Sequence, residues 1–122
     1  MASAINWFEL PAKNLDRAKA FYEAVLEMEM IVPFSDMKYA MFPADMMNGE
    51  IGGGLVEQEG HEPSQQGALI YLNGGPDLDV PLARVEVAGG KIVMPKTSIG
   101  QNGFMARFID TEGNLVAFHS MG

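Results

Sequence analysis

The stretch of sequence that decides the fold lies at residues 8–26 and reads FELPAKNLDRAKAFYEAVL. Just upstream, residues 5–10 mix β-formers with polar residues and run into Pro11, which predicts a short strand closed by a turn. Asn14 stands where a helix N-cap belongs. Apolar residues then recur at spacings of three and four, which predicts an amphipathic helix over residues 15–26.

The composition is that of one small globular domain. The chain has 122 residues, of which 48% are apolar, so it is long enough for a core and too short for two ordinary domains. It contains no cysteine, which excludes disulfides and thiolate chemistry. Its net charge of −8 argues against nucleic acid as a partner. No apolar run approaches the roughly 20 residues that cross a bilayer, and no signal-like segment opens the chain, so we expect a cytoplasmic protein without a membrane partner.

Beyond the first helix, the same order of elements occurs twice. Short apolar stretches bounded by turn-forming residues predict strands over 30–32, 39–42 and 51–56, and later over 68–72, 91–94, 103–109 and 115–119. A second helix is predicted from near Asp79 to the residues before Gly89-Gly90. Asn14-Leu15-Asp16 precedes Asp77-Leu78-Asp79 by 63 residues. We therefore expect one domain made of two modules, about 1–60 and 61–122, that pack together.

Three stretches form an ordered set of motifs. They are Phe8-Glu9-Leu10-Pro11 with Asn14-Leu15-Asp16-Arg17-Ala18 and Phe21-Tyr22, then Ala83-Arg84-Val85-Glu86 with Ala88-Gly89-Gly90, and finally Asp110-Thr111-Glu112-Gly113-Asn114. This set resembles the vicinal oxygen chelate superfamily, which includes glyoxalases, bleomycin-resistance proteins and dioxygenases. The chain departs from the family pattern at Glu27, where glycine is usual, and at Thr111, where proline is usual. The resemblance implies an α+β fold in which two βαβββ modules with curved mixed sheets surround a cleft, often in a homodimer.

Many members of this superfamily hold a divalent metal in the cleft through His, Glu or Gln side chains. By the resemblance, the ligand positions fall at Trp7, at Ile70 or Leu69, at Ala117, and within the glycine-rich residues 51–55. None of these side chains suits a divalent metal. We therefore predict no cofactor, and a divalent metal only if an atypical site exists.

Strand alternation indicates which side chains line the cleft if the family's inward face is retained. Residues two apart on a strand share a face, so Trp7 accompanies Glu9, and Ala117 accompanies His119. These four residues are expected to converge. A carboxylate and an imidazole can hold a polar ligand, or act as catalytic acid and base.

Further side chains extend this candidate site. Tyr71 is expected opposite Glu9 if the Gly74-Gly75-Pro76 segment contains an insertion, and Leu72 if it does not. Phe104 and the methionines are expected to give the cleft apolar walls. The predicted ligand-binding residues are thus Trp7, Tyr71, Phe104 and Ala117.

Purely structural roles remain open for the same residues. Glu9 can bind the backbone of the turn that follows it, His119 can be exposed near the C-terminus, and Trp7 can fill the core. Tyr71 can lie in the core or an interface. Arg107 can neutralise an anionic ligand, but its place on a strand close to Asp110 favours a surface ion pair.

Two functions of different classes follow. The first is a glyoxalase/bleomycin-resistance-like protein that binds a small apolar or aromatic molecule in a dimer cleft without the usual metal. The second is a lyase- or isomerase-type enzyme that uses Glu9 and His119, or an atypical metal site. The absence of the family's metal ligands favours the first. A nucleotide-binding protein and a hydrolase with a nucleophile elbow are unsupported, because the chain has neither a phosphate-binding loop nor that elbow motif.

Overall fold

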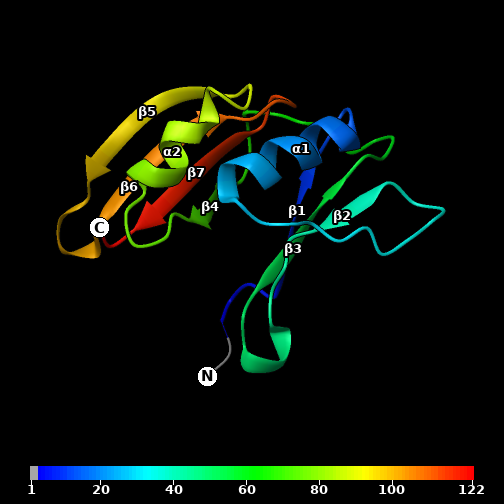
Figure 1. Ribbon diagram of the computed structural model, residues 1–122, viewed down its shortest axis with the longest axis horizontal. Coiled ribbons are helices and arrows are strands. Elements are labelled where there is room, and N and C mark those ends of the chain that lie inside the picture. The colour runs from blue at the N-terminus through cyan, green and yellow to red at the C-terminus, as the bar shows by residue number, and fades with distance from the viewer. Residues whose placement is uncertain (1–2) are drawn as a thin grey trace.

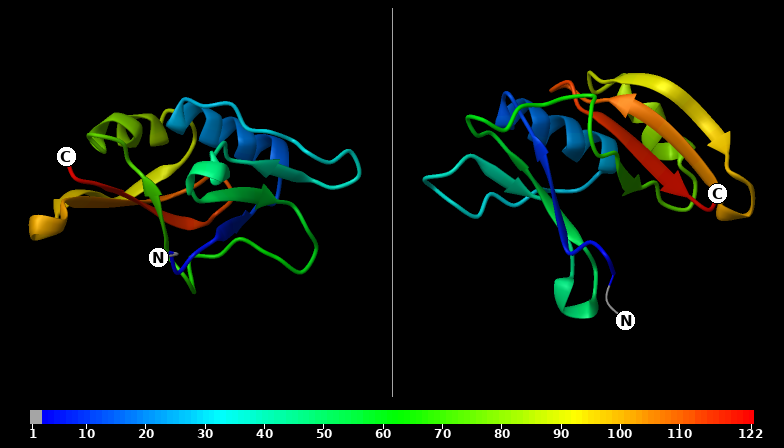
Figure 2. Two further views of the ribbon diagram at one scale, coloured as in Figure 1. Left: turned by 90° about the horizontal axis from the view of Figure 1, so that it is seen from below. Right: turned by 180° about the vertical axis from the view of Figure 1, so that it is seen from behind.

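The computed structural model describes residues 3–122 and shows two sheets with two helices packed on them (Figure 1). The elements in chain order are β1 (Trp7–Pro11), α1 (Leu15–Leu26), β2 (Tyr39–Met41), the short 3-10 helix η1 (Met46–Asn48), β3 (Gly52–Val56), β4 (Ile70–Asn73), α2 (Asp79–Val85), β5 (Lys91–Ser98), the 3-10 helix η2 (Gly100–Asn102), β6 (Phe104–Ile109) and β7 (Leu115–Ser120). Both α-helices lie on the same side of the strands (Figure 2). We call the sheet faces that point away from the helices the open faces.

The first sheet has the strand order β1-β3-β2. β1 runs parallel to β3, which pairs antiparallel with β2 on its other side. Leu10, Ala40 and Leu55 share one row and are all buried under α1, so this is the core face. Trp7 and Glu9 alternate with the core-facing residues of β1 and therefore lie on the open face.

The predicted strand over residues 30–32 is wrong. Only Ile31 forms a bridge, and it exchanges two backbone hydrogen bonds with Met41, of 3.0 and 2.7 Å. Pro33 follows two residues later, has no N–H to donate, and blocks further pairing. The side chains of Ile31 and Val32 stay about half exposed as a result.

The second sheet has four strands in the order β4-β7-β6-β5, with β4 parallel to β7 and the other pairs antiparallel. Leu72, Phe118 and Ala106 form one of its buried rows. α2 starts at Asp79 as predicted but ends at Val85, earlier than expected, and the chain continues through turns to Gly89. β5 extends four residues beyond the predicted strand because its irregular register lets it follow β6 through two shifts.

The alternation of β4 decides between the two alignments of the modules that the sequence left open. Leu72 is buried while Tyr71 lies on the open face, so Tyr71 corresponds to Glu9 and Leu69 corresponds to Trp7. Between strand and helix, the second module therefore has one residue more than the first. This is the insertion that the Gly74-Gly75-Pro76 segment suggested.

One hydrophobic core contains residues of both modules. On α1, Phe21 and Tyr22 are almost fully buried, and the Phe21 ring lies 6.0 Å from that of Phe108 on β6. Phe108 in turn lies 4.9 Å from Phe118 on β7. The helix of the first module thus covers part of the second sheet. Among the described residues, neither helix is long and apolar enough to span a membrane.

The turn between β6 and β7 fastens the second module to the start of α1. Glu112 accepts hydrogen bonds from the backbone N–H groups of Lys13 (2.9 Å) and Asn14 (2.8 Å), and pairs with Arg17 at 2.8 Å. Only 1% of the Glu112 side chain is exposed. The carboxylate therefore satisfies N–H groups that the helix start leaves without partners.

The two departures from the family pattern have clear local consequences. Glu27 ends α1 in the left-handed conformation, with φ of 49°, which is the conformation that favours glycine. Its carboxylate lies 3.1 Å from Arg84 of the second module. Thr111 donates a hydrogen bond of 2.8 Å to Glu112 and so supports the same turn.

Candidate functional site

The open face of the first sheet carries a hydrogen-bonded row of three side chains. Trp7 Nε1 donates to the hydroxyl of Tyr39 at 2.8 Å, and that hydroxyl donates to Glu9 Oε2 at 2.9 Å. Burial raises the pKa of Tyr39, and the neighbouring Glu9 raises it further, against the opposing effect of the Trp7 hydrogen bond. The phenol therefore stays neutral, and its O–H group donates a hydrogen bond to Glu9.

The glycine triplet on β3 is what lets aromatic rings lie flat on this sheet. A Cβ at Gly52 would lie 2.8 Å from the Trp7 ring, and one at Gly54 would overlap the ring of Tyr39. On the core face, a Cβ at Gly53 would overlap Phe8. Each glycine thus makes room for one ring, and Gly54 allows Tyr39 to reach across β3 to Glu9.

Tyr39 is the site residue that the sequence analysis missed. Its strand was predicted, but nothing in a three-residue strand fixes which partner its hydroxyl meets. The available signal was the glycine triplet, because three glycines in a central strand indicate that large side chains cross it.

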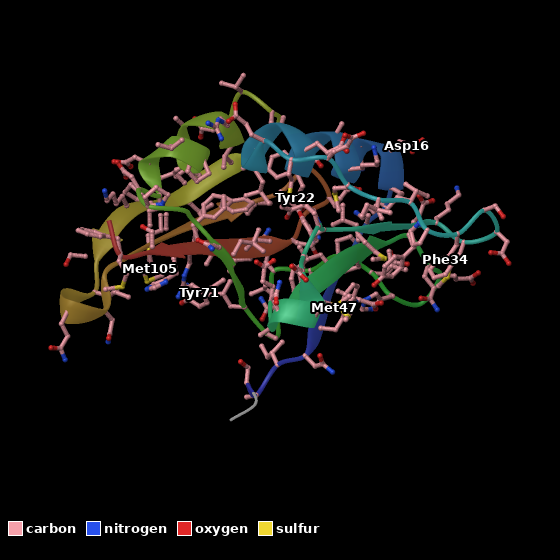
Figure 3. The ribbon with its side chains drawn as sticks, turned by 60° about the horizontal axis from the view of Figure 1, so that its bottom comes forward. Asp16, Tyr22, Phe34, Met47, Tyr71 and Met105 are labelled. Carbon is pink, nitrogen blue, oxygen red and sulfur yellow. The ribbon has the colours of Figure 1, made fainter. Side chains whose placement is uncertain are left out.

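A cavity of about 870 Å³ lies on the open face of the second sheet. Its wall consists of Tyr71, Leu72, Asn73, Gly75, Pro76, Ile99, Met105, His119, Ser120 and Met121. Asn73, His119 and Met105 come from one cross-strand row, and Tyr71 belongs to the next row. Tyr71 and Met105 lie on the side of the sheet away from the helices (Figure 3).

The imidazole of His119 is held in place by a backbone group. Its Nε2 lies 2.7 Å from the carbonyl oxygen of Asn102 at the end of η2. Because a carbonyl only accepts hydrogen bonds, Nε2 carries the proton, and a neutral His119 keeps Nδ1 as an acceptor. The hydrogen bond from Nε2 to Asn102 thus fixes the orientation of the ring in the cavity wall.

Two other predicted ligand-binding residues lie elsewhere. Phe104 shares its face with the buried Ala106 and Phe108, packs against the core, and has the Lys96 ammonium 4.6 Å from its ring centre. It does not face the cavity. Ala117 lies on the open face between Tyr71 and Arg107 but is fully covered by its surroundings.

The expected convergence of the four cleft residues is only partial. Trp7 and Glu9 lie together on the first sheet, joined through Tyr39, and His119 lies on the second sheet. The cavity that has His119 in its wall does not include Glu9, and the cavity between the two modules includes neither residue. Within one chain, this carboxylate and this imidazole do not form a pair.

A smaller cavity of about 400 Å³ lies between the two modules. Ile5, Phe8 and Ile51 line it from the first module, and residues 69–73 line it from the second. β1 and β4 are both edge strands of their sheets, so the cavity lies beside two unpaired strand edges. Its walls are mostly apolar, and it shares residues 71–73 with the larger cavity.

The residues at the family's metal positions do not fit a metal. Trp7 is bound to Tyr39, Leu69 lines the apolar intermodule cavity, and Ala117 is buried. Across residues 3–122, no three His, Cys, Asp or Glu side chains lie close enough together to hold one ion. The side chains at these three positions are aromatic or aliphatic.

The predicted ion pair between Arg107 and Asp110 is wrong. Asp110 is buried and bonds instead to the hydroxyl of Tyr22 (2.7 Å) and to the backbone and side chain of Asn114. Arg107 lies on the open face of β6, and none of the ion pairs formed by the described residues includes it. Its Nε is buried and has no hydrogen-bond partner.

Solved structures share this fold over nearly the whole chain. A glyoxalase/bleomycin resistance protein from Albidiferax ferrireducens has a TM-score of 0.76 at 15% identity, covering 95% of this chain and 97% of that one. A hypothetical protein from S. aureus has a TM-score of 0.68 at 24% identity, covering 98% of both chains. A mutant of the fosfomycin resistance protein FosX from Listeria monocytogenes, complexed with Mn(II) and dihydroxypropylphosphonic acid, has a TM-score of 0.66 at 19% identity, covering 100% of this chain and 95% of that one.

A search of curated protein sequences found no match. The family model for the Glyoxalase/Bleomycin resistance protein/Dioxygenase superfamily, in contrast, matches residues 4–118. The match extends from the segment before β1 into β7 and therefore includes both modules. Together with the shared fold, it confirms the resemblance drawn from the three motifs: this chain belongs to the Glyoxalase/Bleomycin resistance protein/Dioxygenase superfamily.

Proposed function

We propose that this chain binds a small molecule with an apolar or aromatic part on the open face of its second sheet. The observation that carries the proposal is the cavity of about 870 Å³, whose wall combines Ile99, Met105 and Met121 with the polar groups of Asn73 and His119. Apolar walls with a few convergent polar groups are typical of sites for small organic ligands. Superfamily members bind small molecules, as the phosphonic acid complex of FosX illustrates for that protein.

Tyr71 is the side chain best placed to contact such a ligand. It is 48% exposed although it lies in the middle of a cavity wall, so much of its ring is free to stack on a bound group. Methionines beside it adapt easily to ligands of different shape. These features favour a ligand with a flat or aliphatic body.

The proposal includes binding without the family's usual divalent metal. It is supported by the side chains at the matching positions, because an indole, a leucine and an alanine offer no lone pair that a divalent metal prefers. The FosX complex contains Mn(II), so we expect the two proteins to differ in how they hold their ligands.

We also propose that two chains form a homodimer through their exposed apolar surfaces. Ile31, Val32, Phe34 and Met37 are each 47–52% exposed, and all lie in the segment between α1 and β2. Phe34 stands well away from Tyr71, at the far end of the molecule (Figure 3). A second copy that covers this segment and the strand edges of β1 or β4 would remove both apolar side chains and unpaired backbone groups from water.

The alternative of acid–base catalysis by Glu9 and His119 has less support. The cavity that has His119 in its wall does not include Glu9, and Glu9 accepts the hydrogen bond of Tyr39. We therefore do not propose this pair as the catalytic groups of an enzyme.

The proposed function is tested by nuclear magnetic resonance on chelator-treated, isotope-labelled protein titrated with indole and p-cresol. We expect saturable shifts at Tyr71, Met105 and His119. Tyr71→Ala should weaken p-cresol binding about fivefold, because it removes an aromatic contact worth about 1 kcal/mol. Val87→Ala is the matched control, since Val87 is 91% exposed and lies outside the cavity.

Two results would count against the proposal. One is a set of shifts confined to the first sheet or to the intermodule cavity. The other is equal affinity in wild type and Tyr71→Ala. Binding that appears only after a divalent metal is added would overturn the metal-free part of the proposal alone.

A further inference from the structure

We propose that the ligand of the second-sheet cavity carries an oxyanion, such as a carboxylate or phosphonate, and that Arg107 binds it. This inference rests on the proposed function and specifies the class of ligand. The guanidinium of Arg107 lies on the open face of β6, and its Nε has no hydrogen-bond partner in the fold.

Arg107 lies in the middle of the second sheet rather than at its margin. Its neighbours across the strands are Ala117 on β7 and Met94 on β5, and Tyr71 lies one strand further along the same row. None of these three side chains is charged. The Nε group of Arg107 is buried without a hydrogen-bond partner, which leaves one N–H of a rigid fork unsatisfied.

The surrounding face has a charge opposite to that of the chain as a whole. The chain carries 16 acidic and eight basic residues. Yet the open-face residues of the three strands next to the cavity include no acidic side chain: they are Tyr71, Asn73, Met105, Arg107, Ile109, Leu115, Ala117 and His119. The nearest acidic residue along the chain, Asp110, is bound to Tyr22 and Asn114 instead. Arg107 therefore lies among uncharged side chains and the imidazole of His119.

The position of Arg107 relative to the cavity suits a ligand with two ends. Met105 lines the cavity, and Arg107 follows two residues later on the same face. Successive residues on one face of a strand are about 7 Å apart, a distance that an extended arginine side chain covers. A ligand can thus place its apolar body against Tyr71 and Met105 while its charged end reaches Arg107.

An oxyanion is the occupant that this geometry fits best. A guanidinium presents parallel N–H groups that match the two oxygens of a carboxylate or the oxygens of a phosphonate. An uncharged polar group satisfies only one of these donors.

The test compares three probes of nearly equal shape. Benzoate, phenylphosphonate and uncharged benzamide are titrated into chelator-treated wild type, and binding is followed by resonance shifts at Tyr71 and Met105. We expect at least one of the two anions to bind about tenfold more tightly than benzamide, with an affinity that falls as salt is raised. The stronger of the two distinguishes a carboxylate site from a phosphonate site.

Two substitutions then isolate the guanidinium. Arg107→Gln should reduce the affinity for the preferred anion about tenfold while leaving benzamide binding unchanged. The anion affinity of Arg107→Lys should lie between those of wild type and Arg107→Gln, because lysine keeps the charge but lacks the paired N–H groups of the guanidinium. Lys91→Gln removes an exposed cation from the far end of the same sheet and serves as the control. Circular dichroism confirms that each variant is folded.

The outcomes separate the two proposals. Equal binding of the anions and benzamide, unaffected by Arg107→Gln, overturns the oxyanion proposal and leaves the proposed function standing. Failure of all three probes to shift the cavity resonances overturns both. A loss of dimer in Arg107→Gln, with no change in anion affinity, shows that a carboxylate of a second copy is the partner of Arg107 and likewise overturns the inference.

Discussion

Replacing Glu112 by glutamine should substantially destabilise this protein, because one carboxylate joins the two modules. It accepts hydrogen bonds from the backbone of Lys13 and Asn14, from Nε and Nη2 of Arg17, and from Thr111. Glutamine keeps the shape but has one acceptor oxygen and directs an NH₂ group at the remaining donors. The change tests whether the turn of the second module caps the helix of the first.

The size of this destabilisation depends on which hydrogen bonds of the buried Glu112 carboxylate are weakened. Hydrogen bonds to a charged group contribute about 1.5–3 kcal/mol each. The Arg17 side chain is 50% exposed, so its pairing with Glu112 is weakened by solvent and counts for little. Both backbone N–H groups bond to Oε1, so the amide oxygen of glutamine keeps these two bonds but as weaker bonds to an uncharged acceptor, while its NH₂ group takes the place of Oε2. Losing the charge weakens each of the two backbone bonds by about 1 kcal/mol, so we expect Glu112→Gln to lower the free energy of unfolding by about 2 kcal/mol. For 122 residues at roughly 2.1 cal/mol/K each, this lowers Tm by about 8 °C.

The effect also has a defined dependence on pH. Burial alone would raise the pKa of Glu112, but hydrogen bonds from Arg17, Asn14 and Thr111 outweigh burial and hold the pKa below its ordinary value of 4.5. A depressed pKa in the folded state means that the carboxylate stabilises the fold fully above the unfolded value. This stabilisation is lost as the pH falls through the lower pKa of the folded state. The difference between wild type and variant should therefore be largest at pH 7 and shrink below about pH 4.5.

Thermal unfolding followed by circular dichroism measures this prediction, with Glu59→Gln as control. Glu59 is an exposed carboxylate, and none of the ion pairs among the described residues includes it. It should change Tm by no more than about 1 °C. An equally small change for Glu112→Gln, or a difference that stays constant down to pH 3, would refute the reasoning about the turn.

Further expected outcomes concern the first module and the assembly. Gly54→Ala should force the Tyr39 ring off the sheet, lowering the free energy of unfolding by about 2 kcal/mol and changing the fluorescence of Trp7. Tyr39→Phe should keep the ring but break the chain from Trp7 to Glu9, costing about 1 kcal/mol in urea unfolding, whereas Tyr71→Phe should cost less because no protein group bonds its hydroxyl in the described residues. Glu27→Gly should stabilise the protein by up to about 1 kcal/mol, since glycine adopts φ of 49° without strain; a loss of stability would mean that the Arg84 contact matters more. Light scattering at micromolar concentration should give twice the 13.2 kDa mass, and Phe34→Asp should shift it toward the monomer; a monomeric wild type would contradict the proposed dimer.

The sequence predicted most of the fold because local signals agreed with the tertiary structure. Asn14 caps α1 through its side chain at 3.1 Å from Arg17 N, and the helix spans the predicted residues. The strand at residues 30–32 failed for a tertiary reason. Three apolar residues before a proline resemble an edge strand. Only Ile31 pairs with another strand residue, so these residues do not form a strand.

The candidate site was less predictable because it depends on contacts between elements. Alternation placed Trp7 with Glu9 and Ala117 with His119 correctly on shared faces. It gave no distance between the two sheets, so it did not reveal that the cavity with His119 in its wall does not include Glu9. The same alternation, counted along β6, would have grouped Phe104 with the buried Ala106 and so removed it from the site.

Arg107 is the clearest case in which the sequence did not predict the contacts of a side chain. Its sequence neighbour Asp110 suggested an ion pair, but Asp110 lies beyond the end of β6 in a turn and is fully engaged by Tyr22 and Asn114. Proximity in sequence said nothing about the direction of the two side chains. A strand residue on the open face and a buried turn residue point to opposite sides of the molecule.

The most direct test of the account is a crystal structure of the chelator-treated protein soaked with an aromatic carboxylate such as benzoate. We predict density for the ring over Tyr71 and Met105, with the carboxylate directed at Arg107 and no metal beside it. Density found only after a divalent metal is added, with that metal held by Glu9 or His119, would contradict the central claim of a metal-free binding site on the second sheet.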